Sequence, residues 1–192
     1  MIGFIVEGHM EEKIIRHFCG GAEVRRLQIN GCKFPVPRIA ERITPHISLL
    51  RRKKVHKVVV IIDREQRDET SEQFENDILD AILKRNAVDI PVQITSPDRN
   101  FESWIVPFLN ANCDVSSERQ DHFEGRNGKS IIRAKFKARG EAYVEVVDGI
   151  RLFKKVRPEK LKEASLSFRR FAGNFNEDCW WLRQCGEHEP FE

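Results

Sequence analysis

Short, largely apolar segments and longer amphipathic segments alternate along the first half of the chain. The segments at residues 2–6, 58–62 and 92–95 are typical of strands that are buried on both faces of a parallel sheet. Residues 24–29 predict a further, shorter strand. Between these segments apolar residues recur every three or four positions, which indicates helices that pack on the sheet. Residues 1–110 therefore predict an α/β fold with a mostly parallel sheet flanked by helices.

The expected helices cover residues 10–18, 37–52, 71–85 and, as a short segment, 101–108. Pro45 should kink or split the second helix, because proline lacks the N–H that the helix needs. Thr70 or Ser71 can cap the third helix. Asp98 or Asn100 can cap the short one in the same way.

The last third of the chain has a different pattern. Residues 111–128 are polar and indicate a loop, whereas residues 129–175 mix apolar and basic positions and look mainly helical. The tail, which contains Trp180-Trp181, ends in polar residues and is expected to be loose. The chain thus divides into an α/β core at 1–110 and a mainly helical C-terminal extension at 111–192 that packs on the core.

Composition narrows the class of protein without naming a ligand. The formal net charge is only +3, so local clusters of charge matter more than the sum. Nothing approaches the roughly 18 apolar residues of a membrane span, and we expect no signal peptide and a cytoplasmic location. The five scattered cysteines indicate reduced thiols, with a zinc site at Cys179, Cys185 and His188 as the alternative.

Acidic residues follow two of the predicted strands. Glu7 comes directly after residues 2–6, and Asp63 and Glu65 come directly after residues 58–62. The carboxyl ends of parallel strands lie at one edge of the sheet, so these carboxylates are expected to meet there. Crowded carboxylates repel, and a hard divalent cation such as Mg²⁺ or Mn²⁺ relieves the repulsion.

Each acid also has an ordinary structural interpretation. Glu7 can be a solvated carboxylate that favours the start of a helix. Asp63 and Glu65 can belong to a charged surface turn, although an extended backbone would point both side chains the same way. In that geometry they would bind one cation, or two cations about 4 Å apart.

Other candidates lie near the same edge or in loops. Glu102 follows a further predicted strand and is expected to complete or orient the metal site. Lys129 opens a helix after Gly128 and can steady a scissile phosphate. Glu11 and Asp68 are weaker candidates, because acids at helix starts and in charged loops are common.

Basic residues form three groups, any of which can contact phosphates or be simply solvated. These groups are residues 51–57 (Arg51, Arg52, Lys53, Lys54, Lys57), residues 126–139 (Arg126, Lys129, Arg133, Lys135, Lys137, Arg139) and residues 154–170 (Lys154, Lys155, Arg157, Arg169, Arg170).

The acidic motifs resemble those of the Toprim superfamily. Glu7-Gly8, with Glu11 three residues later, resembles the family's glutamate-glycine after the first strand, and Asp63-Arg64-Glu65 stands at the position of its Asp-x-Asp. Asn100-Phe101-Glu102-Ser103-Trp104 is similar to a segment of small stand-alone Toprim-like proteins found in bacterial defence loci. These include RloB-like proteins, and the OLD nucleases belong to the same superfamily. The resemblance covers residues 1–110 and implies a Rossmann-like core.

By this resemblance Glu7 is a general base or metal ligand, and Asp63 is the first acid of the Asp-x-Asp pair. Glu65 stands where the family has aspartate, and its extra methylene changes its reach to a metal. The chain lacks the DNA-gate regions of topoisomerases and the zinc module of primases, and its lone tyrosine, Tyr143, has no matching context. The nuclease branch of the superfamily therefore fits best.

The resemblance implies a divalent-metal-dependent nuclease that cleaves DNA or RNA, including tRNA, in defence against phage. A second interpretation is a non-catalytic module that is switched by an ATPase partner. A homodimer is a further expected partnership of this chain. A third interpretation is phosphotransfer or nucleotidyl transfer by the same carboxylates. The chain has no ATP-binding glycine-rich loop of its own, so any ATPase would be another protein.

Overall fold

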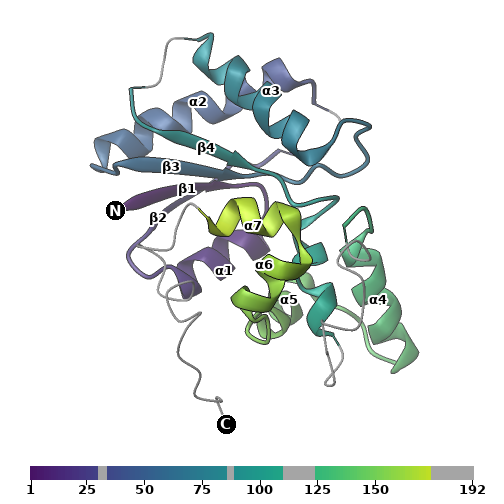
Figure 1. Cartoon of the computed structure of the whole chain (residues 1–192). Helices are drawn as coiled ribbons and strands as arrows, with labels where there is room; N and C mark the ends of the chain where they lie inside the picture. The colour runs from purple at the N-terminus through teal and green to yellow at the C-terminus, as the bar shows by residue number, and fades with distance from the viewer. Residues whose placement is uncertain (30–33, 86–88, 110–123, 174–192) are drawn as a thin grey trace.

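Four strands form one parallel sheet in a computed structural model that describes residues 1–29, 34–85, 89–109 and 124–173. The sheet order is β2-β1-β3-β4 (Figure 1). The strands are β1 (Ile2–Val6), β2 (Glu23–Arg26), β3 (Lys57–Ile61) and β4 (Val92–Thr95). Every neighbouring pair is parallel. The predicted α/β architecture is confirmed.

Helices cover both faces of this sheet (Figure 1). In Figure 1, α2 and α3 lie on one side, and α1 lies with α5, α6 and α7 on the other. The helices are α1 (His9–Phe18), α2 (Val36–Arg52), α3 (Ser71–Leu83), α4 (Gly128–Ala138), α5 (Glu145–Phe153), α6 (Pro158–Ala164) and α7 (Leu166–Ala172). Two 3₁₀ helices, η2 (Phe101–Trp104) and η3 (Val106–Phe108), follow β4.

The two sheet faces bury separate sets of apolar side chains. Ile5 and Val60 face a core that α2 and α3 complete. Phe4 and Val59 face the other core, which includes side chains of α1 and of every helix from α4 to α7. Since both faces are covered, a strand needs apolar residues at every position, which explains the unbroken runs in the sequence.

Several local expectations are confirmed and others are wrong. Thr70 caps α3 by accepting a hydrogen bond from the Gln73 backbone N–H. Helix α2 runs without a break through Pro45, so the predicted split does not occur. Strand β2 ends at Arg26 rather than at residue 29, and two 3₁₀ helices replace the single helix expected at residues 101–108.

The capping role predicted for Asn100 is also wrong. Its side chain makes no capping hydrogen bond to η2, and instead Nδ2 donates to Oδ1 of Asn127 at 3.0 Å. Asn127 in turn caps α4 by accepting from the Ser130 backbone N–H at 2.9 Å. This pair therefore joins the start of η2 to the start of α4.

Some predictions concern residues outside the described part of the chain. They are the zinc alternative at Cys179, Cys185 and His188, the tail with Trp180-Trp181, and most of the loop at 111–128. The helical nature of residues 129–173 is confirmed, because α4 to α7 fill most of that range. None of the described helices has the length and apolar character needed to cross a bilayer.

Candidate functional site

The sheet register brings the first two acidic motifs together at one edge. Val6 pairs with Ile61 at the carboxyl ends of β1 and β3, so Glu7 and Asp63 follow side by side. The backbone N–H of Asp63 donates a hydrogen bond to Oε2 of Glu7 at 3.1 Å. The expected approach of Glu7 and Asp63 is confirmed.

Glu11 is more deeply buried than expected for an acid at the start of a helix. Its side chain, on the first turn of α1, is 5% exposed. A Cβ on Gly8 would overlap Oε2 of Glu11, so glycine provides the space for this carboxylate. The backbone of Gly8 is extended, with φ −108° and ψ 176°, and does not itself require glycine. In the sequence, the feature that could have indicated the burial of Glu11 is Gly8, three residues earlier.

Glu102 brings a further carboxylate to the site from the η2 segment after β4. It is 2% exposed. Burial raises its pKa from 4.5 to about 7, and the nearby Lys129 ammonium opposes that rise. Burial also raises the pKa of Glu11 to about 7, with Glu7 and Glu145 adding to the effect.

The negative charges of the neighbouring carboxylates also affect the pKa of Asp63. Burial of its carboxyl group raises its pKa well above the usual value, and Glu11, Glu7 and Glu102 raise it further, in that order. Carboxylates from the turn after β1 and the first turn of α1, from the loop after β3 and from η2 thus act on one another. We name Glu7, Glu11, Asp63 and Glu102 the carboxylate cluster.

Lys129 lies beside the carboxylate cluster, at the first turn of α4, and forms an ion pair with Glu145 at the start of α5. Its ammonium acts on both Glu11 and Glu102. No local pattern in the sequence indicates a role for Glu145, because acids at the start of a helix are common. Tyr143 lies nearby and packs inward, with its hydroxyl donating to Sδ of Met10 at 3.7 Å.

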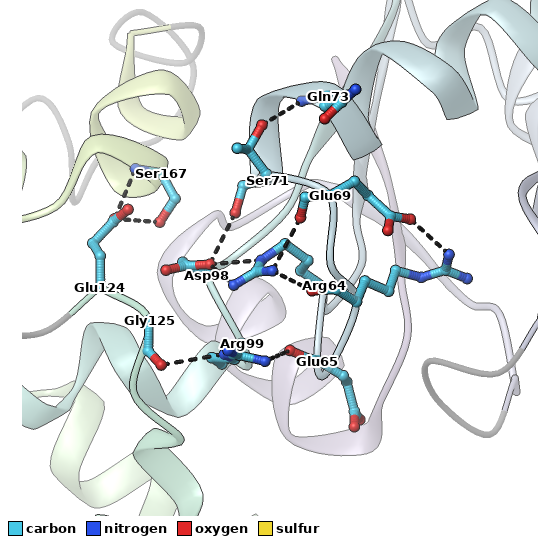
Figure 2. Close-up of polar contacts among 12 residues, drawn as sticks. Arg64, Glu65, Glu69, Ser71, Gln73, Asp98, Arg99, Glu124, Gly125 and Ser167 are labelled. Carbon is cyan, nitrogen blue, oxygen red and sulfur yellow. Dashed lines mark hydrogen bonds and ion pairs between the residues drawn. The ribbon is translucent and has the colours of Figure 1, made fainter.

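Glu65 does not share the geometry of Asp63. The expectation that an extended backbone would point both side chains the same way is wrong, because Glu65 has a left-handed backbone with φ 55°. Its carboxylate points away from the Arg64 side chain in Figure 2. Among the carboxylates that raise the pKa of Asp63, Glu65 has the smallest effect. Asp68 is exposed in the same loop.

A buried arginine fixes the loop that follows Asp63 (Figure 2). Arg64 is 7% exposed, and its Nε donates to Oδ1 of Asp98 at 2.6 Å. Its Nη1 donates to the backbone carbonyls of Arg67 and Glu69. Arg64 therefore ties the loop after β3 to the loop after β4 and closes the turn that places Asp63.

Arg99 adds a second connection at this edge (Figure 2). Its Nη1 donates to the Glu65 carbonyl at 2.9 Å, and its Nε donates to the Gly125 carbonyl at 3.2 Å. The adjoining Glu124 accepts hydrogen bonds from the Ser167 hydroxyl and backbone N–H of α7. The segment before α4 is thus held both to the carboxyl edge of the sheet and to the C-terminal helices.

The donor chemistry of the carboxylate cluster fits a hard divalent cation. Oε2 of Glu11 and Oε1 of Glu102 are buried and have no hydrogen-bond partner, so each has an unused oxygen. The side chains are not yet placed around a single cation position. Among the described residues, no three carboxylate, histidine or cysteine side chains are arranged to hold one metal ion together. Binding a cation would require these side chains to rotate toward a common point.

Gly128 lets α4 approach the cluster. A Cβ at this position would overlap the backbone N of Ser103 and the backbone C of Glu102. We expect Gly128→Ala to lower the free energy of unfolding by about 1–3 kcal/mol through overpacking, as measured by urea denaturation. The control is Gly20→Ala, because a Cβ on Gly20 meets open space. Equal stability of both variants would contradict the close packing of α4.

Comparisons with protein-family models, with curated proteins and with solved structures gave no match to this chain.

Proposed function

We propose that the protein is a divalent-metal-dependent nuclease. The observation that supports this best is the carboxylate cluster, which gathers the buried Glu11 and Glu102 and the partly buried Glu7 and Asp63 at the carboxyl edge of a parallel sheet. Parallel α/β sheets bind their ligands at this edge. Burying several mutually repelling carboxylates destabilises a fold unless a ligand offsets their charge, which points to a cation.

The side chains have distinct roles in this proposal. Glu7, Asp63 and Glu102 would hold Mg²⁺ or Mn²⁺ through their oxygens. The bound ion would supply a more acidic water and stabilise charge on the reacting phosphate. Glu11, whose pKa burial raises to about 7 in the metal-free protein, would be the acid–base group beside these ligands. Lys129 adds positive charge beside the cluster, and its release from Glu145 would free it for a phosphate.

A second candidate is a non-catalytic, partner-switched module. It is favoured by the absence, among the described residues, of three side chains arranged around one metal position. In that case a partner such as an ATPase would either complete the site or use the charged edge as a contact surface. The two candidates differ in whether the isolated protein cuts nucleic acid.

A cleavage assay tests the nuclease. Plasmid, single-stranded DNA and total tRNA are incubated with wild type or Glu7→Gln, in Mg²⁺, Mn²⁺ or EDTA. We expect metal-dependent cutting by the wild type and a loss of at least about 100-fold in Glu7→Gln, because the amide cannot replace an anionic ligand. The control is Glu141→Gln, an exposed acid in the loop after α4.

Two outcomes would count against the nuclease. Cutting that survives Glu7→Gln would place the activity outside this site. Folded wild-type protein that cuts none of the substrates would favour the partner-switched module. A role in defence against phage enters the proposal only through the Toprim resemblance, and infection of cells that express the wild type or Glu7→Gln tests it.

A further inference from the structure

Two of the three basic groups in the sequence are poor candidates for binding a substrate at the carboxylate cluster. Their residues lie far from it or are held in ion pairs. Residues 51–54 precede β3 and so lie at the amino edge of the sheet, and Arg51 there pairs with Asp89. Residues 154–157 follow α5, whose nine residues place them about 13 Å from its start at Glu145. Arg170 is bound by Glu75.

Helix α4 differs from both. It contains Lys129, Arg133, Lys135 and Lys137 and no acidic residue. Its first residue, Gly128, packs against the backbone of Glu102, so the helix starts at the carboxylate cluster. In Figure 1 it stands at the periphery of the molecule, away from the sheet.

The basic side chains of α4 fall into two sets. Lys129 is partly buried and paired with Glu145 at the cluster. Arg133 and Lys137 follow at intervals of four residues and are exposed, as is Arg126 just before the helix. No acidic side chain in the described part of the chain forms an ion pair with these three residues. The positive charge of Arg133 acts on Lys129, so the charges continue outward from the cluster.

We propose that Arg126, Arg133 and Lys137, here called the α4 basic face, bind the phosphates of a nucleic-acid strand that passes through the carboxylate cluster. This inference rests on the proposed function and specifies which surface beside the carboxylate cluster holds the strand that the nuclease would cut. An acidic cluster repels a polyanion, so such a substrate needs cations beside the site. Exposed arginine and lysine side chains on α4 and just before it supply contacts that do not depend on base sequence.

The apolar residues of α4 argue against a membrane or a protein as the partner. Ile132 and Phe136 are buried in the core, and none of the exposed large apolar side chains lies on this helix. A helix that binds a lipid surface needs an exposed apolar face. Protein interfaces likewise centre on buried apolar anchors. The α4 basic face has exposed positive charges and no exposed large apolar side chain, which favours contact with a phosphate backbone.

The test measures binding of a fluorescein-labelled oligothymidylate of about 20 nucleotides to metal-free protein, by anisotropy at several salt concentrations. We compare wild type, Arg133→Ala/Lys137→Ala and the control Arg52→Ala/Lys53→Ala. Both variants remove two exposed positive charges, but the control pair lies at the end of α2, at the amino edge of the sheet. Alanine favours helix at the exposed positions of α4, so folding should be retained.

We expect Arg133→Ala/Lys137→Ala to weaken binding by about tenfold at low salt and to make the slope of log affinity against log salt shallower by about 1.4, the value for two phosphate contacts on a single strand. The control should match the wild type. A slope equal to that of the wild type, an equal loss in the control, or no binding by the wild type would overturn the inference.

Hydrolysis of bis(p-nitrophenyl) phosphate in Mn²⁺ separates this inference from the proposed function. Arg133→Ala/Lys137→Ala should hydrolyse this small diester at the wild-type rate while cutting the oligonucleotide more slowly. Equal losses on both substrates would overturn the α4 basic face as a polymer contact. Binding through α4 by a protein that cuts neither substrate would refute the nuclease and leave the inference standing.

Discussion

Replacing Glu102 by glutamine should make the metal-free protein progressively more stable than the wild type as the pH rises. The side chain is almost fully buried, and its pKa is about 7 instead of 4.5. A shift of this size corresponds to a difference of about 3 kcal/mol between the two protonation states. Glutamine keeps the size of the side chain and removes the ionisation.

The direction follows from proton linkage. Between pH 4.5 and about 7 the folded wild type keeps a proton on Glu102 that the unfolded chain has already lost. The contribution of Glu102 to stability is therefore complete below pH 4.5 and is lost as the pH rises through about 7. Glu11, with a similar pKa, adds to the same loss in the wild type and in the variant.

Urea denaturation in EDTA checks this expectation. The difference in free energy of unfolding between Glu102→Gln and wild type should grow by about 3 kcal/mol from about pH 4.5 to about pH 8. Glu141→Gln, at an exposed position, should show no such growth. A difference that stays constant over this range would mean that Glu102 does not ionise in a buried site.

Removing the Trp104 side chain should destabilise the protein by about 3–5 kcal/mol. Trp104 is 1% exposed, and its ring lies 5.1 Å from that of Phe168 and 5.2 Å from that of Phe171, both on α7. Its Nε1–H donates to the Ser167 hydroxyl at 3.0 Å. Trp104→Ala would therefore open a cavity between η2 and α7 and remove a buried hydrogen bond.

The matched comparison is Leu166→Ala on α7, the helix against which Trp104 packs. Leu166 is 58% exposed, and its truncation should change the free energy of unfolding by less than about 0.5 kcal/mol. Both variants are measured by urea denaturation at the same pH. A loss below about 1 kcal/mol in Trp104→Ala would contradict the dense packing of α7 on η2.

The sheet was accessible to prediction because its signals are local. An unbroken apolar run such as residues 58–62 requires burial on both faces, and that alone places Asp63 at a carboxyl edge. Helix α2 shows the limit of local rules. Its buried stripe, which includes Ile43 and Ile47, packs against the sheet, and this packing outweighs the disruption expected from Pro45.

Only some of the residues of the carboxylate cluster could be predicted from the sequence. Glu11 and Glu65 are both acids near a predicted strand end, and spacing ranked Glu65 first. Their burial is decided by features that spacing does not contain: the space beside Gly8 and the left-handed turn at Glu65. Glu145 reaches the site because α5 packs on α1, a long-range contact that no local pattern reports.

The shared core of β1 and the C-terminal helices has a consequence for synthesis on the ribosome. All four described strands and η2 are synthesised before α4 to α7. The apolar side chains of β1, α1 and η2 that face these helices, Trp104 among them, therefore lack their partners in the nascent chain. A fragment that ends before Gly128 should expose this surface and aggregate, so a chaperone that shields it would favour correct folding.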